Sequence, residues 1–173
     1  MGDPKKPRKK YKTPRHPWKA DVLMEELQLV GEYGLRNKRE LWRAKTELSK
    51  YRRMAMSLLG EPPERRAELE NILLSKLRRM GLVDENATLD DVLDLTVRDL
   101  LDRRLQTMVY KMGLAKSIHQ ARQLITHGHI SIGDRRVTSP GYIVLKDEEP
   151  LIRFSPDSPF KAPLAAAEGG EVK

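Results

Sequence analysis

The stretch that decides the fold is residues 100–145, LLDRRLQTMVYKMGLAKSIHQARQLITHGHISIGDRRVTSPGYIVL. Its first apolar residues recur at the spacing of one helix face: Leu101, Leu105, Met108, Val109 and Met112. Gly113 ends this helix at the position where a left-handed residue is needed. Ser117 begins a second helix, since Gln120 completes a capping box, and Gly128 ends it. The sequence therefore predicts two short helices joined by a tight turn.

A small antiparallel sheet is expected after these helices. Apolar and polar residues alternate over 130–132, Gly133–Asp134 turns the chain, and Val137 lies on the returning strand. Further short strands are expected at 142–145, after a Pro-Gly turn, and at 151–154. The predicted fold class is mainly α with a small antiparallel β part (α+β).

The polar side of the two helices is basic. Away from the apolar stripes we expect Arg103, Arg104, Thr107 and Lys111 on the first helix, Lys116 in the turn, and His119, Arg122, Gln123 and His127 on the second. Arg135 and Arg136 follow the hairpin turn. Two helices at a fixed angle would present one continuous basic surface. Such a surface favours a phosphate backbone, because binding it releases counterions.

The whole chain is basic and contains no cysteine. Its 173 residues include 33 Lys and Arg against 25 Asp and Glu, which points first to a polyanionic partner. The absence of cysteine removes disulfides, thiol catalysis and cysteine zinc sites. No apolar stretch approaches the ~20 residues that span a bilayer. We therefore expect a cytoplasmic protein without a membrane segment.

Residues 1–19 are expected to form a basic extended arm. They hold eight basic residues against Asp3, and four prolines prevent a regular helix. A solvated tail that aids solubility is one interpretation. Tyr11, His16 and Trp18 add stacking surfaces, which favours an arm that orders against a phosphate backbone.

Helical spacing runs through residues 20–99. Helices are expected from Ala20 to the glycine at 31, over 38–59, and from Pro62–Pro63 up to Gly81. The residues of the third helix that should face a core are Leu69, Ile72, Leu73, Leu77 and Met80.

The second of these helices is strongly basic. Residues 36–53 hold eight basic residues against Glu40 and Glu47, whereas an ordinary exposed helix interleaves both signs. Phosphate contact is favoured over a merely solvated face. The residues expected to bind RNA here are Lys38, Arg39, Arg43, Lys45, Arg52 and Arg53.

Residues 84–102 reverse the charge, with seven acids against Arg98. Thr88 is interpreted as a helix N-cap followed by acids in the first turn. No histidine or glycine loop frames these acids, so no metal site is expected. His127 and His129 should diverge across a helix end, and no catalytic residue is expected.

Several segments resemble a known family. Residues 114–117, LAKS, followed by 120–125, QARQLI, and 129–133, HISIG, resemble the RNA-binding module named after ribosomal protein S-four, which has an α-L architecture. Residues 32–41, EYGLRNKREL, resemble the N-terminal helical region of that ribosomal family. Residues 89–106, LDDVLDLTVRDLLDRRLQ, resemble its archaeal and eukaryotic branch. The short C-terminus favours the archaeal form.

This resemblance implies which side chains contact RNA. In the family, the helix corresponding to residues 117–127 and the turn before it lie against the RNA backbone. Carried over, the contacts are Lys116, Ser117, His119, Gln120, Arg122 and Gln123, with Arg103, Arg104, Arg135 and Arg136 beside them. Lys111 and His127 of the basic surface complete the set. Such contacts go largely to phosphate and shape, so no base-specific recognition is expected.

The resemblance also implies a function. The chain would be a non-catalytic structural constituent of the small ribosomal subunit, a primary rRNA-binding protein that nucleates assembly of the 5′ domain and body. It would clamp a multi-helix rRNA junction, contact ribosomal protein S-five, and lie beside mRNA near the channel through which mRNA enters, supporting translational accuracy. Some members hold zinc through N-terminal cysteines, which this chain lacks. No cofactor or small-molecule substrate is implied.

Four segments are expected along the chain: a basic arm over 1–19, a helical rRNA-binding domain over 20–99, an S-four-type domain over 100–160, and a flexible tail over 161–173.

Two other functions are compatible with the same sequence features. The same module occurs in pseudouridine synthases, tyrosyl-tRNA synthetases and small stress proteins, so the main alternative is an RNA-modifying or tRNA-binding protein. That alternative needs a sheet-rich catalytic domain, which the helical N-terminal half does not offer. A DNA-binding helix-turn-helix protein is the second. It usually has dimerisation elements, whereas this chain has further basic helical regions.

Overall fold

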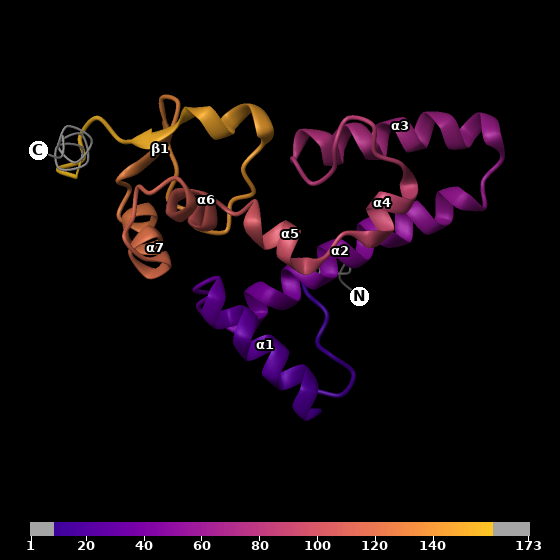
Figure 1. Cartoon of the computed structure of the whole chain (residues 1–173), viewed down its shortest axis with the longest axis horizontal. Helices are drawn as coiled ribbons and strands as arrows, with labels where there is room; N and C mark the ends of the chain where they lie inside the picture. Colours follow the sequence, from indigo (N-terminus) through magenta and orange to yellow (C-terminus); the bar gives the residue numbers. More distant parts are fainter. Residues whose placement is uncertain (1–8, 161–173) are drawn as a thin grey trace, which may run out of the picture.

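The computed structural model describes residues 9–160. Its elements are α1 (Ala20–Glu32), α2 (Lys38–Leu59), α3 (Pro63–Arg79), α4 (Leu89–Asp94), α5 (Val97–Asp102), α6 (Leu105–Lys111), α7 (Ile118–Thr126), β1 (Ile130–Ile132), β2 (Arg135–Arg136), the 3-10 helix η1 (Lys146–Leu151) and β3 (Ile152–Phe154). The first part of the molecule is built around α2, against which α1, α3, α4 and α5 pack. The second part contains α6, α7 and the sheet, at the opposite end from α3 (Figure 1). The tail expected at 161–173 and the first eight residues of the arm lie outside the described residues.

Helix α2 has the predicted bounds because both of its ends are signalled in the sequence. Asn37 caps the start by accepting a hydrogen bond from the backbone N–H of Glu40 at 3.3 Å, and Gly60 follows the end. One side is buried against the other helices: Leu41, Ala44, Leu48, Tyr51, Ala55 and Leu58. Burial of this stripe anchors the first hydrophobic core, which extends from Leu35 to Leu101.

Helix α3 begins at a proline as predicted, but its expected core stripe was partly wrong. Leu73 and Leu77 are buried, whereas Leu69 is 46% and Ile72 is 66% exposed. Leu74, which the prediction omitted, is buried instead. The helix carries apolar residues on more than one side, and neighbouring elements cover only one of them.

The acidic segment forms two short helices that start in the same way. Thr88 and Asp91 make a capping box at α4, and Thr96 and Asp99 make one at α5. In each box the threonine N–H donates to the aspartate at 2.7 Å. The predicted N-cap at Thr88 is thereby confirmed, and two of the acids are used to start helices.

The first helix expected in residues 100–112 is in fact two helices, α5 and α6, because the chain leaves the helical path at Arg103. There the backbone pairs with a later segment. The N–H of Leu105 donates to the carbonyl oxygen of Tyr142 at 2.8 Å. The N–H of Val144 donates to the carbonyl oxygen of Arg103 at 2.9 Å. The strand expected from Tyr142 is therefore only an isolated bridge, followed by η1. Both expectations failed because these two segments pair with each other.

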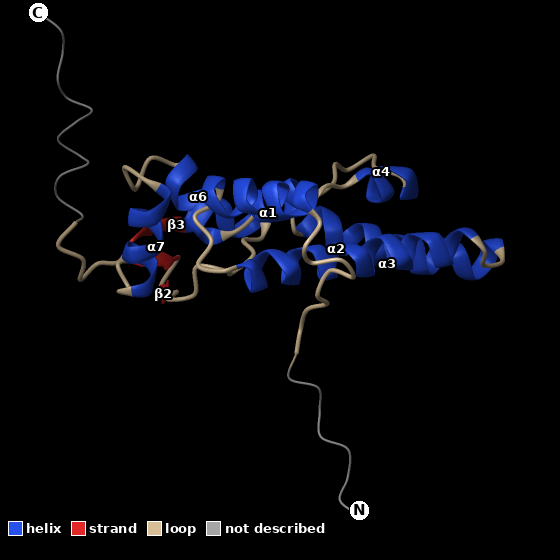
Figure 2. Ribbon diagram, turned by 90° about the horizontal axis from the view of Figure 1, so that it is seen from below, coloured by secondary structure: helices blue, strands red, loops and turns tan. Residues whose placement is uncertain are grey.

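The three strands form one antiparallel sheet in the order β2-β1-β3, confined to one end of the molecule (Figure 2). Ile132 pairs with Arg135 across the predicted turn and with Ile152 on its other side. Gly133 adopts φ 58° in that turn, a conformation that favours glycine. The sheet shares a second hydrophobic core with α6 and α7, which includes Leu105, Val109, Ile125, Ile130 and Val144. The predicted α+β class is confirmed.

Two leucines one turn apart on the same side of α3 test how far along the helix its burial extends. Leu73→Ala leaves a cavity in the first core and should lower the free energy of unfolding by about 2–5 kcal/mol. Leu69→Ala, one turn away, should change it by less than about 1 kcal/mol because that side chain already contacts solvent. Urea titration followed by circular dichroism measures both. Equal losses would contradict the burial described for α3.

Candidate nucleic-acid interface

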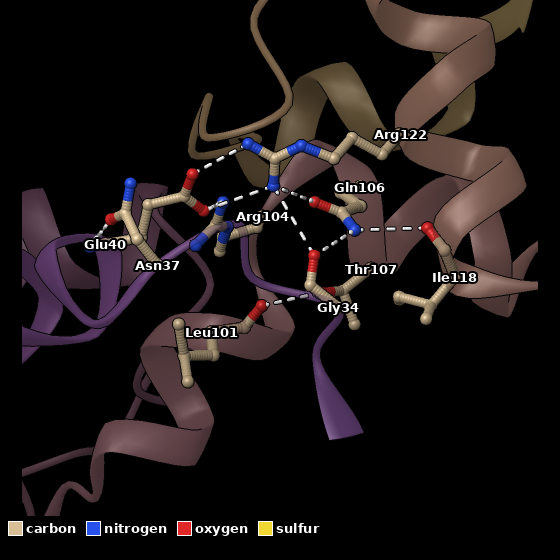
Figure 3. A network of polar contacts seen from close by, with 9 residues as sticks. All are labelled: Gly34, Asn37, Glu40, Leu101, Arg104, Gln106, Thr107, Ile118 and Arg122. Carbon is tan, nitrogen blue, oxygen red and sulfur yellow. Dashed lines mark hydrogen bonds and ion pairs between the residues drawn. The ribbon is translucent and has the colours of Figure 1, made fainter. Parts of the chain in front are cut away.

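A partly buried carboxylate joins the two parts of the molecule (Figure 3). Glu40 lies in the first turn of α2 and accepts hydrogen bonds from two arginines of the second part. Nη2 of Arg104 lies 2.7 Å from Glu40 Oε2, and Nη2 of Arg122 lies 2.7 Å from Glu40 Oε1. Each carboxylate oxygen thus receives a charged donor, which is the strong form of the hydrogen bond.

Gln106 and Gly34 complete this network. The Gln106 side chain is fully buried, and its Nε2 donates to the carbonyl oxygens of Gly34 and Ile118, both at 3.1 Å. Its Oε1 accepts from Nη1 of Arg122 at 3.2 Å. Gly34 adopts φ 55°, and a Cβ there would lie 2.9 Å from the Ile118 side chain. The two parts can approach this closely because residue 34 has no side chain.

The charge of Glu40 is stabilised by its arginines. Burial raises the pKa of this carboxyl, but the hydrogen bonds from Arg122 and Arg104 outweigh burial and hold the pKa below its ordinary value of 4.5. Glu40 is therefore ionised at neutral pH and balances part of the arginine charge at the junction.

Arg103 makes a second connection between the two parts. Its Nη1 donates to Glu149 at 2.9 Å, and its Nη2 donates to the carbonyl oxygen of Val144 at 3.1 Å. The guanidinium also lies against Gly81, where a Cβ would approach it to 2.9 Å. Arg103 and Arg104, the two arginines at the break between α5 and α6, thus both donate hydrogen bonds to acids within the chain.

The expectation that Arg103, Arg104 and Thr107 point away from the core was wrong. Arg104 is 6% exposed, and Thr107 is buried with its Oγ1 donating to the carbonyl oxygen of Leu101 at 2.8 Å. The helix break at Arg103 is the physical reason, because α6 does not continue the path of α5 and turns a different side inward. Arg122, likewise expected on an open surface, is only partly exposed and is held by Glu40.

Five further residues predicted to contact RNA have partners within the chain. The pairs are Lys38 and Lys45 with Glu26 at 3.3 and 3.4 Å, Lys111 with Asp102 at 3.1 Å, Arg136 with Asp157 at 2.8 Å, and Arg52 with the carbonyl oxygen of Leu95. Glu26 is buried, so its two lysines stabilise the packing of α1 on α2. Lys111 and Arg136 remain about half exposed, so their charges still reach solvent.

The remaining basic and polar candidates form two exposed stripes. We add the exposed Lys50, which was not predicted, and call the whole set the basic face: Arg39, Arg43, Lys50 and Arg53 on α2, and Lys116, His119, Gln123, His127 and Arg135 on the second part. The α2 residues recur at helical spacing on one side, as do those of α7 and its preceding turn. Arg43 lines the same hollow as Arg122, Ser139 and Gly141, so the α2 stripe borders the second part directly.

Ser117 and Gln120 shape the turn that presents Lys116. The Ser117 side chain accepts from the N–H of Gln120 at 3.2 Å, which confirms the predicted cap. The Gln120 side chain accepts from the N–H of Lys116 at 2.7 Å rather than from that of Ser117. The reciprocal bond of the expected capping box is therefore shifted by one residue.

The described part of the arm lies along α2. The N–H of Lys12 donates to Thr46 Oγ1 at 2.9 Å, and the ring centroids of Tyr11 and Trp42 are 5.9 Å apart. Trp18, in contrast, is 88% exposed. Of the aromatic side chains expected to stack on a partner, Tyr11 packs within the chain and Trp18 is open.

Metal-binding clusters are absent from the described range 9–160: no three His, Asp or Glu side chains there gather around one point. The rings of His127 and His129 have centroids 6.4 Å apart. His129 instead contacts Ser158 and the ring of Phe160. No helix in the same range is long and apolar enough to cross a membrane.

Glu40 and Gln106, which organise the site, were not predicted from the sequence. Glu40 was counted only as a charge opposing the basic helix, and Gln106 was not considered. A lone acid within a strongly basic helix was the available signal at Glu40. Nothing in the sequence indicates its partners, which lie 64 and 82 residues further along the chain.

Two short helices followed by a small sheet, joined by ion pairs to a basic helical domain, define the class of two-part proteins with an α-L RNA-binding module. The family described as "Ribosomal protein S4/S9 N-terminal domain" matches residues 5–102, and the family described as "S4 domain" matches residues 103–149. The chain belongs to the family of small ribosomal subunit protein uS4.

Similar proteins of that name come from several archaea. The protein of Ignicoccus hospitalis is 65% identical, over 92% of this chain and 96% of its own. That of Sulfurisphaera tokodaii is 58% identical and that of Saccharolobus solfataricus 56%, each over 99% of this chain and 97% of its own. The resemblance to an archaeal, non-enzymatic ribosomal protein family is therefore confirmed.

Glu40→Gln tests the junction by removing a charge at nearly constant shape. The folded-state pKa of Glu40 is lowered, so its ionised form stabilises the fold above pH 4.5, and this contribution is lost as pH falls through the folded-state pKa. The variant should lower the free energy of unfolding by about 3 kcal/mol at pH 7 and by much less in acid. Urea titrations at several pH values measure the difference.

Glu25→Gln is the matched control, because Glu25 is exposed on α1. It should leave the free energy of unfolding nearly unchanged at every pH. A loss in Glu40→Gln that does not depend on pH would show that the charge of Glu40 does not stabilise the junction.

Proposed function

We propose that this protein is a structural constituent of the small ribosomal subunit that binds rRNA through the basic face. The observation that carries the proposal is that the exposed basic stripe of α2 borders the second part of the molecule, which has an exposed basic stripe of its own. Arg43 on α2 borders the hollow that also contains Arg122 of α7. The names of the relatives, small ribosomal subunit protein uS4, support the same conclusion.

The ion pairs at the junction suit the face to a folded RNA. Glu40 and Gln106 fix α7 relative to α2, so the stripe of Arg39 and Arg43 has a set direction relative to Lys116. Little ordering entropy is then lost on binding. A rigid pair of stripes suits phosphates from two RNA helices that meet at a fixed angle, and recognition of this kind reads shape rather than bases.

Neutralisation of phosphates gives this binding a role in assembly. RNA helices repel one another, and basic side chains placed between them reduce that repulsion. We extend the proposal to a multi-helix junction of the rRNA 5′ domain, clamped early so that the 5′ domain and body can assemble. Contact with ribosomal protein S-five, proximity to mRNA near the channel through which it enters, a contribution to translational accuracy and a cytoplasmic location belong to the same proposal. They rest on the family resemblance.

Charge reversal on the basic face tests rRNA binding. Arg43→Glu with Lys116→Glu changes one exposed residue in each part without touching the junction ion pairs. Affinity for a small-subunit rRNA 5′-domain fragment should fall. The negative slope of log K against log salt should become shallower by about two, one for each lost phosphate contact. Filter binding over a range of salt concentrations gives both quantities.

Arg65→Glu with Arg79→Glu provides the control, because it makes the same change in net charge on exposed residues of α3. This variant should keep most of the affinity and the salt slope of the unmodified protein. Equal effects of the two double variants would mean that only net charge matters. A preference for duplex DNA of equal length over the rRNA fragment would reject the proposal.

A further inference from the structure

Helix α1 differs in charge from the basic helix it packs on. Its sequence, ADVLMEELQLVGE, contains four acids and no basic residue. Glu26 is buried against α2, whereas Asp21, Glu25 and Glu32 lie on the surface. In a chain of net charge +8, an acidic helix such as α1 repels phosphate. RNA is therefore not the partner that the outer side of α1 suits.

The outer side of α1 is also apolar. Met24 is 70% and Leu27 is 57% exposed, and Gly31 continues the same side one turn further on. Apolar side chains gathered on one exposed side mark an interaction surface, and methionine is enriched in protein interfaces. We call Asp21, Met24, Glu25, Leu27 and Gly31 the α1 surface.

Gly31 has no role within the described structure. Its φ is not left-handed, and a Cβ at this position would meet no atom within 4 Å. Glycine is the least favoured residue in a helix after proline, so an exposed helical glycine weakens α1 without an internal reason. The close approach of another chain explains a position that lacks a side chain.

A second exposed apolar surface shows why charge decides the partner. It lies between α2 and α3 and is lined by Met54, Leu69 and Ile72, with Lys76 and Glu61 at its rim. Charges of both signs there select no class of partner. At the α1 surface Asp21 lies 3.7 Å from the exposed Lys19, whereas Glu25 makes no salt bridge within the described residues 9–160. The net charge of the helix is acidic, and this charge selects a cationic partner.

We infer that the α1 surface binds a basic amphipathic segment of a neighbouring protein. Apolar side chains of that segment cover Met24 and Leu27, its Lys or Arg side chains pair with Asp21 and Glu25, and its backbone approaches at Gly31. This interaction is separate from RNA binding, because the basic face uses other elements of the molecule.

Photocrosslinking in assembled small subunits tests this inference. p-Benzoylphenylalanine is placed at position 24 of the full chain, the subunits are irradiated, and the crosslinked product is identified by mass spectrometry. The expected product is a protein segment with net positive charge. A crosslink to RNA, a crosslink to an acidic segment, or no crosslink would overturn the inference. The same probe at position 43 should crosslink RNA, so a failure of the proposed function is seen separately.

Two variants distinguish binding from folding. Leu27→Glu should lower the protein crosslink yield at position 24 about tenfold, as expected for loss of one interface anchor. Gly31→Gln should lower it similarly while leaving or raising the Tm of the free protein, because glutamine favours a helix. Ile72→Glu, on the other exposed apolar surface, is the matched control and should leave the yield unchanged. An unchanged yield in the first two variants, or a weakened affinity of both for rRNA, would refute the α1 surface as a protein site.

Discussion

Glu40 accepts hydrogen bonds from Arg104 and Arg122, so a single carboxylate on α2 holds α6 and α7 through their arginines. An arginine as buried as Arg104 is costly without a counter-charge, and the loss of such a partner typically destabilises a protein by several kcal/mol. The other junction contacts depend on this arrangement. Gln106 on α6 can donate to Gly34 only while α6 stays near the start of α2. The direction of one basic stripe relative to the other is thus set by an acid.

The basic residues of this chain serve two purposes that composition cannot separate. Arg103, Arg104 and Arg122 hold the two parts together, while Arg43 and Lys116 remain exposed. All of them looked alike in the sequence, since each stands in a basic stretch away from an apolar stripe. The structural arginines differ only in having acids as neighbours, and those acids are 46 to 82 residues away along the chain. Charge clustering therefore predicted a polyanion-binding protein, but it did not show which of the basic residues pair with acids inside the chain.

Local signals predicted local structure. Thr88 and Ser117 cap helices where expected, and Gly113 and Gly128 end them with positive φ, because these preferences act within one turn of the chain. The errors arose where distant segments decide. The pairing of residues 103–105 with 142–144 breaks one predicted helix and removes one predicted strand. On α3, periodicity located a helix but could not show which of its apolar sides would be covered.

The separation of the junction residues along the sequence affects how a newly synthesised chain folds. Arg122 follows Glu40 by 82 residues, so a ribosome adding about 5–20 residues per second exposes α2 roughly 4–16 seconds before α7 exists. During that interval the nascent chain has a complete basic helix and a carboxylate without its arginines. The junction therefore closes only after a loop of 82 residues has formed, nearly half of the 173-residue chain. Each new copy passes through a stage in which its two halves are still independent.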